Sequence, residues 1–164
     1  MTQSAITNNT ITNYTFEELT IGQSVSFTKV VSDEHIQLFA ATSGDVNPVH
    51  LDDDFAATTQ FGKRIAHGML TGAFISAGLA MQLPGPGTVY LGQSLTFRKP
   101  VFIGDVLTVT LTVKEKRTDK PFVTIDCQVT NADGKAVAFG DAVVMAPEAK
   151  ATITVPAMPK VTIG

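Results

Sequence analysis

Apolar and polar residues alternate along most of the second half of the chain, which is the pattern of β-strands with one buried face. The alternation is clearest over residues 107–114 and 123–130, and residues 89–97 and 136–145 are two further candidate strands. Turn-forming residues separate these segments, as at residues 131–134. Short strands joined by such turns predict an antiparallel meander.

The first half of the chain changes to a helical period. After a short alternating segment at residues 25–31, Ser32 is suited to cap a helix whose apolar positions include Ile36 and Phe39. Ser43 and Gly44 predict its end. A second, short helix is expected over residues 52–59, where acidic residues come first.

The longest apolar segment, about residues 68–83, predicts a helix that is hydrophobic around almost its whole circumference. Such a helix is expected to be buried on all sides, so a sheet must wrap it. Its length would be about 24 Å at about 1.5 Å per residue, which is less than the roughly 30 Å of a bilayer core. Residues 84–87, Pro-Gly-Pro-Gly, interrupt the apolar run. We therefore expect a core helix and no membrane span.

Together these elements predict an α+β protein in which one antiparallel sheet surrounds one helix. The 164 residues suit one domain of about 100–200 residues, which we expect over residues 14–164. Residues 1–13 are rich in Thr and Asn and lack the regions of a signal peptide. We expect them to form a disordered tail.

Composition narrows the classes of function. The net charge of −3 argues against a nucleic-acid-binding protein, which needs a basic face. Cys127 is the single cysteine, so no internal disulfide can form, as suits the reducing cytoplasm. Its place in an alternating segment predicts a small buried hydrophobic residue.

An acid and a base, Asp45 and His50, stand five positions apart on a segment broken by Gly44 and Pro48. A turn there would let both side chains face one pocket. A carboxylate and an imidazole that share a water molecule can take a proton and return one. The alternative is a plain structural turn, and the pattern leaves open which residue is the formal base.

The segment from Phe39 to His50, followed by the segment from Arg64 to Leu70, resembles the signature of the MaoC-like, R-specific enoyl-CoA hydratases. The resemblance implies a hot-dog fold, a homodimer, and hydration of trans-2-enoyl-CoA to R-3-hydroxyacyl-CoA. It also implies that Asp45 and His50 are catalytic. It suggests that the product feeds polyhydroxyalkanoate synthesis.

Four residues of the second half are candidates for the substrate site. Gly68, at the start of the long helix, could donate its backbone N–H to the thioester oxygen, or serve only tight packing. By correspondence with the resembled hydratases, Ser76 lies beside the catalytic pair, where it could hydrogen-bond the pair or the helix backbone. By the same correspondence, Leu79 and Val143 line the acyl tunnel, and ordinary core packing is the alternative.

Asn47 is expected to hold the turn by a backbone hydrogen bond or to orient His50, and His67 to shape the entry of the long helix. Because the histidines lack the spacing of a metal site and no nucleotide-binding motif is present, we expect no metal and no cofactor. Basic residues near these blocks could contact coenzyme A phosphates or form a solvated rim. They are Lys63, Arg64, Arg98 and Lys99.

Three other functions fit the same residues less well. A 3-hydroxyacyl-carrier-protein dehydratase would run the same chemistry in reverse on another carrier. A hot-dog thioesterase would direct water to the thioester carbon instead. A non-catalytic acyl-CoA-binding module would be expected to have lost Asp45, His50 or Gly68, and all three are present.

Overall fold

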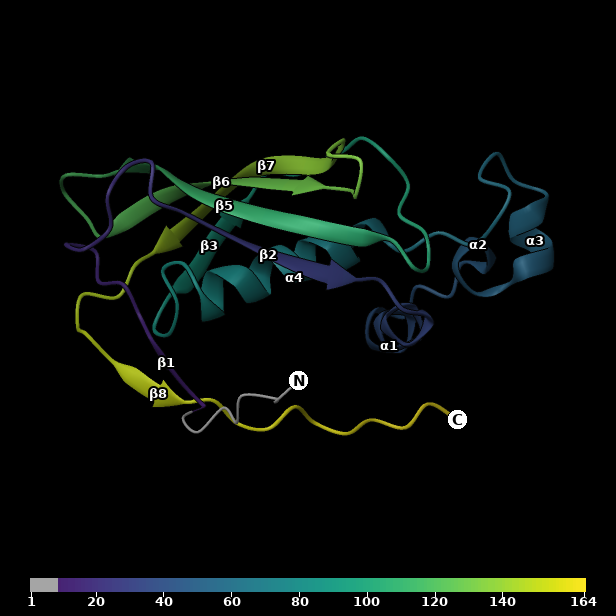
Figure 1. Cartoon of the computed structure of the whole chain (residues 1–164), viewed down its shortest axis with the longest axis horizontal. Coiled ribbons are helices and arrows are strands. Elements are labelled where there is room, and N and C mark those ends of the chain that lie inside the picture. Colours follow the sequence, from purple (N-terminus) through teal and green to yellow (C-terminus); the bar gives the residue numbers. More distant parts are fainter. Residues whose placement is uncertain (1–8) are drawn as a thin grey trace, which may run out of the picture.

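The structure, a computed structural model, describes residues 9–164, and its centre is an antiparallel sheet curved around one long helix (Figure 1). The predicted α+β, hot-dog architecture is confirmed. The strand order is β2-β5-β6-β7-β3, with β4 also paired to β7. The strands of this sheet are β2 (Ser24–Val30), β3 (Val89–Gln93), β4 (Thr96–Phe97), β5 (Val106–Lys116), β6 (Phe122–Thr130) and β7 (Ala136–Met145).

The core lies between the inner face of the sheet and the central helix α4 (Gly68–Met81). Alternate residues of the long strands face the helix, so that Leu111 of β5 and Ile125 of β6 are fully buried. On the helix, Ile75 and Leu79 point into this layer and are equally inaccessible. The period-two pattern of the strands and the apolar helix thus meet as the sequence predicts.

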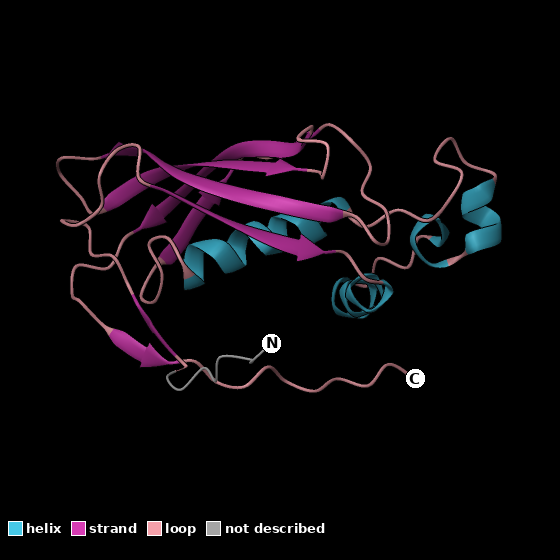
Figure 2. Ribbon diagram, in the orientation of Figure 1, coloured by secondary structure: helices cyan, strands magenta, loops and turns pink. Residues whose placement is uncertain are grey.

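The expectation that α4 is buried on all sides is wrong for the single chain. Met69 is 56% exposed and Met81 is 40% exposed, and Ala73, Ala77 and Ala80 on the same side are exposed as well. The sheet covers α4 from one side only (Figure 2), so that one flank of the helix remains apolar and uncovered.

The prediction of a disordered tail over residues 1–13 is wrong for residues 10–13. Residues 1–8 lie outside the described part of the chain, but β1 (Thr10–Thr12) pairs with β8 (Thr152–Thr154) in a separate two-stranded ribbon. Asn13 next to it is 1% exposed, and its amide bonds the carbonyls of Pro86 and Ala149 at 3.0 Å. Pairing with the C-terminal segment therefore orders residues that the sequence pattern leaves as a tail.

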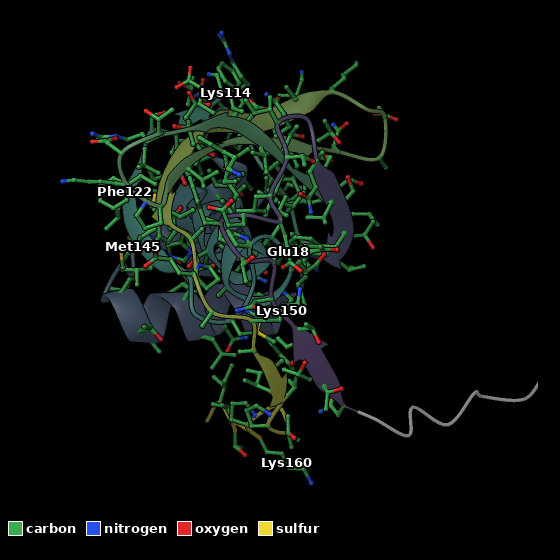
Figure 3. The ribbon with its side chains drawn as sticks, turned by 90° about the vertical axis from the view of Figure 1, so that its left-hand side faces the viewer. Glu18, Lys114, Phe122, Met145, Lys150 and Lys160 are labelled. Carbon is green, nitrogen blue, oxygen red and sulfur yellow. The ribbon has the colours of Figure 1, made fainter. Side chains whose placement is uncertain are left out.

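The ribbon is tied to the body by an ion pair near its base. The Lys150 ammonium lies 2.7 Å from the Glu18 carboxylate, and Figure 3 shows the two side chains close together. The hydrogen bonds from Lys150 hold the pKa of Glu18 below its usual range. Both side chains are largely exposed, so the pair contributes little to stability.

Three short helices precede α4 and gather at one end of the molecule (Figure 1). They are α1 (Asp33–Ser43), α2 (Pro48–Leu51) and α3 (Asp53–Ala57). Ser32 caps α1 and Gly44 ends it, as predicted. The sequence pattern did not predict α2, which begins at Pro48 in the first helical position that proline favours. No helix in residues 9–164 is long and apolar enough to cross a membrane.

Candidate active site

The turn between α1 and α2 is built from local hydrogen bonds. Gly44 adopts a left-handed conformation at φ 78° to end α1. The Asp45 carboxylate then accepts the Asn47 N–H at 3.2 Å, and the Asn47 side chain accepts the Val49 N–H at 3.2 Å. Asn47 therefore caps α2, the helix that carries His50, which is the structural role expected for it.

The turn brings Asp45 and His50 together as predicted. His50 Nε2 lies 3.7 Å from Asp45 Oδ2, and the exposed fractions of the two side chains are 11% and 49%. That separation is too long for a direct hydrogen bond, yet a single water molecule could bond to both groups. His50 Nδ1 is 2.8 Å from the Ile65 carbonyl. As a donor to this carbonyl, Nδ1 carries the proton, which leaves Nε2 as an acceptor facing Asp45.

His67 supports both members of this pair from one side. Its side chain is nearly inaccessible, its Nε2 donates to the Asp45 carbonyl at 2.9 Å, and its ring stacks on that of His50 at 3.8 Å. Phe39 covers another side, with ring centroids 4.9 Å apart. The sequence predicts that His67 forms a hydrogen bond near the helix entry, but nothing in it indicates that the acceptor is Asp45.

Asp45, His50 and His67 form a cluster whose possible metal-ligand atoms all lie within 4.8 Å of one another, which residue spacing did not reveal. Each imidazole uses one nitrogen on a backbone carbonyl, so each keeps one lone pair. The rings are only 28° from parallel, so these in-plane lone pairs lie side by side and do not converge on a common point. The arrangement fits proton transfer better than metal coordination.

Gly68 is the first residue of α4, and its N–H has no partner within the helix. A Cβ atom at this position would lie 3.2 Å from the Phe97 ring, so glycine lets this ring pack closely against the start of the helix. Gly68 and the catalytic pair line one cavity of about 440 Å³, which we name the catalytic cavity. Its lining residues are Phe39, Ser43, Asp45, His50, His67, Gly68, Met69 and Phe97.

Two further cavities adjoin the catalytic cavity. The distal cavity, of about 400 Å³, shares Phe39 and Met69 with it. Its other lining residues are Gly72, Ala73, Ser76, Tyr90 and Gln93. The outer cavity, of about 370 Å³, shares His67, Gly68 and Phe97 with the catalytic cavity and reaches Arg98 and Lys99.

The structure separates Ser76, expected beside the Asp45–His50 pair, from Leu79 and Val143, expected to line the acyl tunnel. Ser76 lines the distal cavity, and among the described residues no hydrogen bond joins its hydroxyl to Asp45 or His50. Leu79 is buried one turn further along α4 and lines none of the three cavities.

Val143 lies on the sheet face away from α4, so it cannot line a tunnel beside this helix. It alternates on β7 with the buried residues Ala142 and Val144. Asp141, two residues earlier on the same face, pairs with Lys114 at 2.7 Å, and Lys114 projects outward from the sheet in Figure 3. Two-residue periodicity puts the neighbours of Val143 on the inner face, a distinction that the sequence pattern did not make.

The basic residues near the site differ in whether their charge is already paired with a carboxylate of the protein. Arg64 is bound to Asp33 at 2.9 Å and to Asp53 at 2.8 Å, and the hydrogen bond that Arg64 donates to Asp53 raises the pKa of the guanidinium. Its role is therefore to join α1 and α3. Arg98, by contrast, packs over the Phe139 ring at 5.3 Å and lines the outer cavity with Lys99.

Comparison with known proteins agrees with this geometry. Residues 15–137 match the family described as MaoC like domain. A protein of Rhodospirillum rubrum named (R)-specific enoyl-CoA hydratase is 51% identical over 80% of this chain and 91% of its own length. One of the same name from Aeromonas caviae is 44% identical over 80% and 98%. The structure of the R-hydratase PhaJ1 of Pseudomonas aeruginosa superposes with a TM-score of 0.91 and 50% identity, covering 94% of this chain and 99% of that one.

Proposed function

The chain belongs to the MaoC-like domain family, and we propose that it is an R-specific enoyl-CoA hydratase. It adds water to trans-2-enoyl-CoA and forms R-3-hydroxyacyl-CoA. The observation that carries the proposal is the 3.7 Å separation of His50 Nε2 and Asp45 Oδ2 in one cavity with the Gly68 N–H.

The Asp45–His50 pair holds the attacking water between its two polar atoms. As the water oxygen bonds to C3, one of its protons passes to the pair, and a proton passes from the pair to C2. The pair ends in its starting protonation state, so no cofactor or metal is consumed. Since both groups contact the same water, the two act as one coupled acid–base unit.

The Gly68 N–H stabilises the negative charge that develops on the thioester oxygen. It stands at the N-terminus of α4, where the helix dipole is positive and the first N–H groups lack intrahelical partners. A donor fixed in place before the reaction contributes about 10²–10³ in rate in other enzymes. An enolate-like oxygen at this position would meet such a donor without reorganisation.

The three adjoining cavities match the parts of an acyl-CoA. The catalytic cavity receives the enoyl thioester, and the apolar distal cavity receives the acyl chain. The outer cavity receives the pantetheine arm, with Arg98 and Lys99 at its rim for phosphate. Lys63, Arg98 and Lys99 remain candidates for phosphate contacts, whereas Arg64 is already paired with two carboxylates.

The decisive experiment follows crotonyl-CoA by its enoyl absorbance and then determines the configuration of the product. We expect loss of absorbance without release of free thiol, an R product, and full activity in the presence of a chelator. Release of free thiol would indicate a thioesterase. If neither loss of enoyl absorbance nor thiol release is seen, the protein is a binding module. A strong preference for enoyl-acyl-carrier protein over enoyl-CoA would indicate the dehydratase.

We also propose a homodimer, formed through the exposed flank of α4 and the outer edge of β3. Strand β3 ends the sheet, and its exposed residues Val89 and Leu91 leave an unpaired apolar edge. Such edges are usually paired or covered, and Ala77, Ala80 and Met81 of α4 add exposed apolar surface. Light scattering at micromolar concentration should give twice the chain mass, and a monomer would contradict the proposal.

The cellular setting follows from the same chemistry. The free thiol of buried Cys127 suits a reducing compartment, which supports a cytoplasmic location. The Aeromonas caviae hydratase structure is described as involved in PHA biosynthesis. We propose the corresponding supply role here, to be tested by polymer accumulation in a producing host that carries this chain.

A further inference from the structure

The distal cavity continues the catalytic cavity along α4. Phe39 and Met69 line both, so an acyl chain whose thioester lies at Gly68 would pass between these two side chains. Beyond them the walls are small, because Gly72 and Ala73 come from the helix. Met69 already fills the space above Gly72, where a Cβ atom would come within 2.9 Å of its methyl group.

A β-bulge determines what stands at the far side of this cavity. Tyr90 pairs with Val144 and Gln93 pairs with Ala142, and the register shifts between Tyr90 and Gly92. Both partners are fully buried on the side of the sheet that faces α4. Residues three apart in a regular strand point to opposite faces, so the bulge turns Tyr90 and Gln93 to the same, inner side.

The two side chains form one hydrogen-bonded unit. The Tyr90 hydroxyl donates to Gln93 Oε1, and Gln93 Nε2 donates to the Ser94 carbonyl at 2.7 Å. Ser94 is in turn held to β7, since its N–H donates to the Asp141 carbonyl at 2.9 Å. Burial raises the pKa of Tyr90 to about 12, so its hydroxyl remains a donor at any physiological pH.

This unit forms the β3 side of a cavity whose other walls, apart from Ser76, are apolar. Its polar atoms satisfy one another and the backbone, so they offer no free group to bind the end of a substrate. A longer acyl chain would have to displace the Tyr90 ring and break its hydrogen bond to Gln93. The unit therefore resists extension of the chain.

We propose that the Tyr90–Gln93 unit is the end wall of the acyl site and determines the length of acyl chain that the protein accepts. The inference rests on the proposed hydratase function. It assigns specificity to a strand on the opposite side of the cavity from Ser76. Neither residue takes part in the chemistry, so both can change without removing the catalytic pair.

The experiment compares kcat/KM for trans-2-enoyl-CoAs of four, six, eight and ten carbons in the wild type, Tyr90→Ala and Tyr90→Phe. In Tyr90→Ala the ratio of the eight-carbon to the four-carbon substrate should rise about tenfold, because two more methylenes become buried. Tyr90→Phe keeps the ring but loses its hydrogen bond to Gln93, and should raise the ratio less. Tyr14→Ala removes the other tyrosine of the chain, also 39% exposed but outside the three cavities, and should leave the ratio unchanged.

An unchanged ratio in folded Tyr90→Ala, or an equal rise in Tyr14→Ala, would overturn the inference. If Tyr90→Ala does not fold, the test rests on Tyr90→Phe. An unchanged ratio of eight-carbon to four-carbon kcat/KM in Tyr90→Phe would then contradict the proposal. A wild type that binds but does not hydrate enoyl-CoA would refute the proposed function instead. The same length ratio would then be measured from calorimetric binding of saturated acyl-CoAs, so that the two failures remain distinguishable.

Discussion

The catalytic turn and the distal cavity lie on either side of Phe39 and Met69, yet they are built in opposite ways. The turn takes Asp45 and His50 from six consecutive residues, and hydrogen bonds between near neighbours shape its backbone. The distal cavity takes its walls from α1, α4 and β3, which only the folded sheet brings together. The Asp45–His50 pair thus comes from one short segment, whereas the walls of the distal cavity depend on packing between distant segments.

The difference implies that the two regions should respond differently to substitution. A change in the turn should reduce turnover for every substrate, because the same water and the same two groups serve all of them. A change in the distal cavity should alter the relative rates of long and short substrates. The predictions below test that division, beginning with the largest effect.

Asp45→Asn and His50→Gln should each reduce kcat by about 10²–10⁴-fold, since general acid–base groups contribute that much. The loss should be the same for every chain length. The double variant should lose less than the product of the single losses, because the pair acts as a unit. Steady-state kinetics over the chain-length series is the measurement. Asp133→Asn, in the exposed turn between β6 and β7, is the matched control. A single variant that keeps more than about a tenth of the activity would contradict these roles.

His67→Phe should reduce kcat by about 10–100-fold with little change in KM, because it removes the hydrogen bond that positions Asp45. The phenyl ring would keep the stacking on His50 and the contact with Phe39. The buried His67 Nδ1 has no partner among the described residues, so its removal should cost little stability. Kinetics and thermal denaturation together distinguish this from a packing role.

His67→Gln supplies the conservative comparison, since its amide can still donate to the Asp45 carbonyl. It should retain more of kcat than His67→Phe although it loses the ring stacking. A marked fall in Tm for His67→Phe with unchanged kcat would show that His67 serves packing alone.

Leu79→Ala should test whether the acyl site extends beyond Ser76 toward the core. If Leu79 closes the cavity along α4, kcat/KM for longer substrates should rise by roughly tenfold, from about two newly buried methylenes. If Leu79 is core only, stability should fall by ~2–5 kcal/mol and the length profile should scale down uniformly. We expect the uniform fall, because Leu79 is fully buried in the core and lines none of the three cavities. Val143→Ala, on the outer face of the sheet, should change neither quantity strongly and is the control.

The smallest effect is expected at Cys127, whose thiol should react only slowly with reagents in the folded protein. It is fully buried on β6, and burial raises the pKa of its thiol to about 11. Because the thiolate is the reactive form, the folded protein should react slowly with a thiol reagent at pH 8 and faster as the pH rises toward 11. Rapid reaction should require denaturant. Fast labelling of the native protein at pH 8 would mean that the sheet beneath the distal cavity opens.

Much of this protein is determined by the sequence alone, because the relevant signals are local. Alternation marks the long strands β5 and β6, the apolar run marks α4, and Gly44 and Pro48 mark the turn between α1 and α2. Asp45, His50 and Gly68 follow from the same segments, because each lies in or beside a recognisable turn or helix start. Hydrogen bonds within a few residues then shape the turn, and the Ile65 carbonyl, 15 positions from His50, orients the imidazole ring.

Other features are decided only by the tertiary structure, because they depend on which distant residues meet. The stacking of His67 on His50, and its bond to the Asp45 carbonyl, require the start of α4 to dock against the turn. The inner or outer face of Val143 depends on strand register, where one residue reverses the direction of a side chain. The bulge that turns Tyr90 and Gln93 inward arises from pairing with β7. Periodicity within a strand carries no information about that partner, so the extent of the acyl site becomes visible only in the assembled sheet.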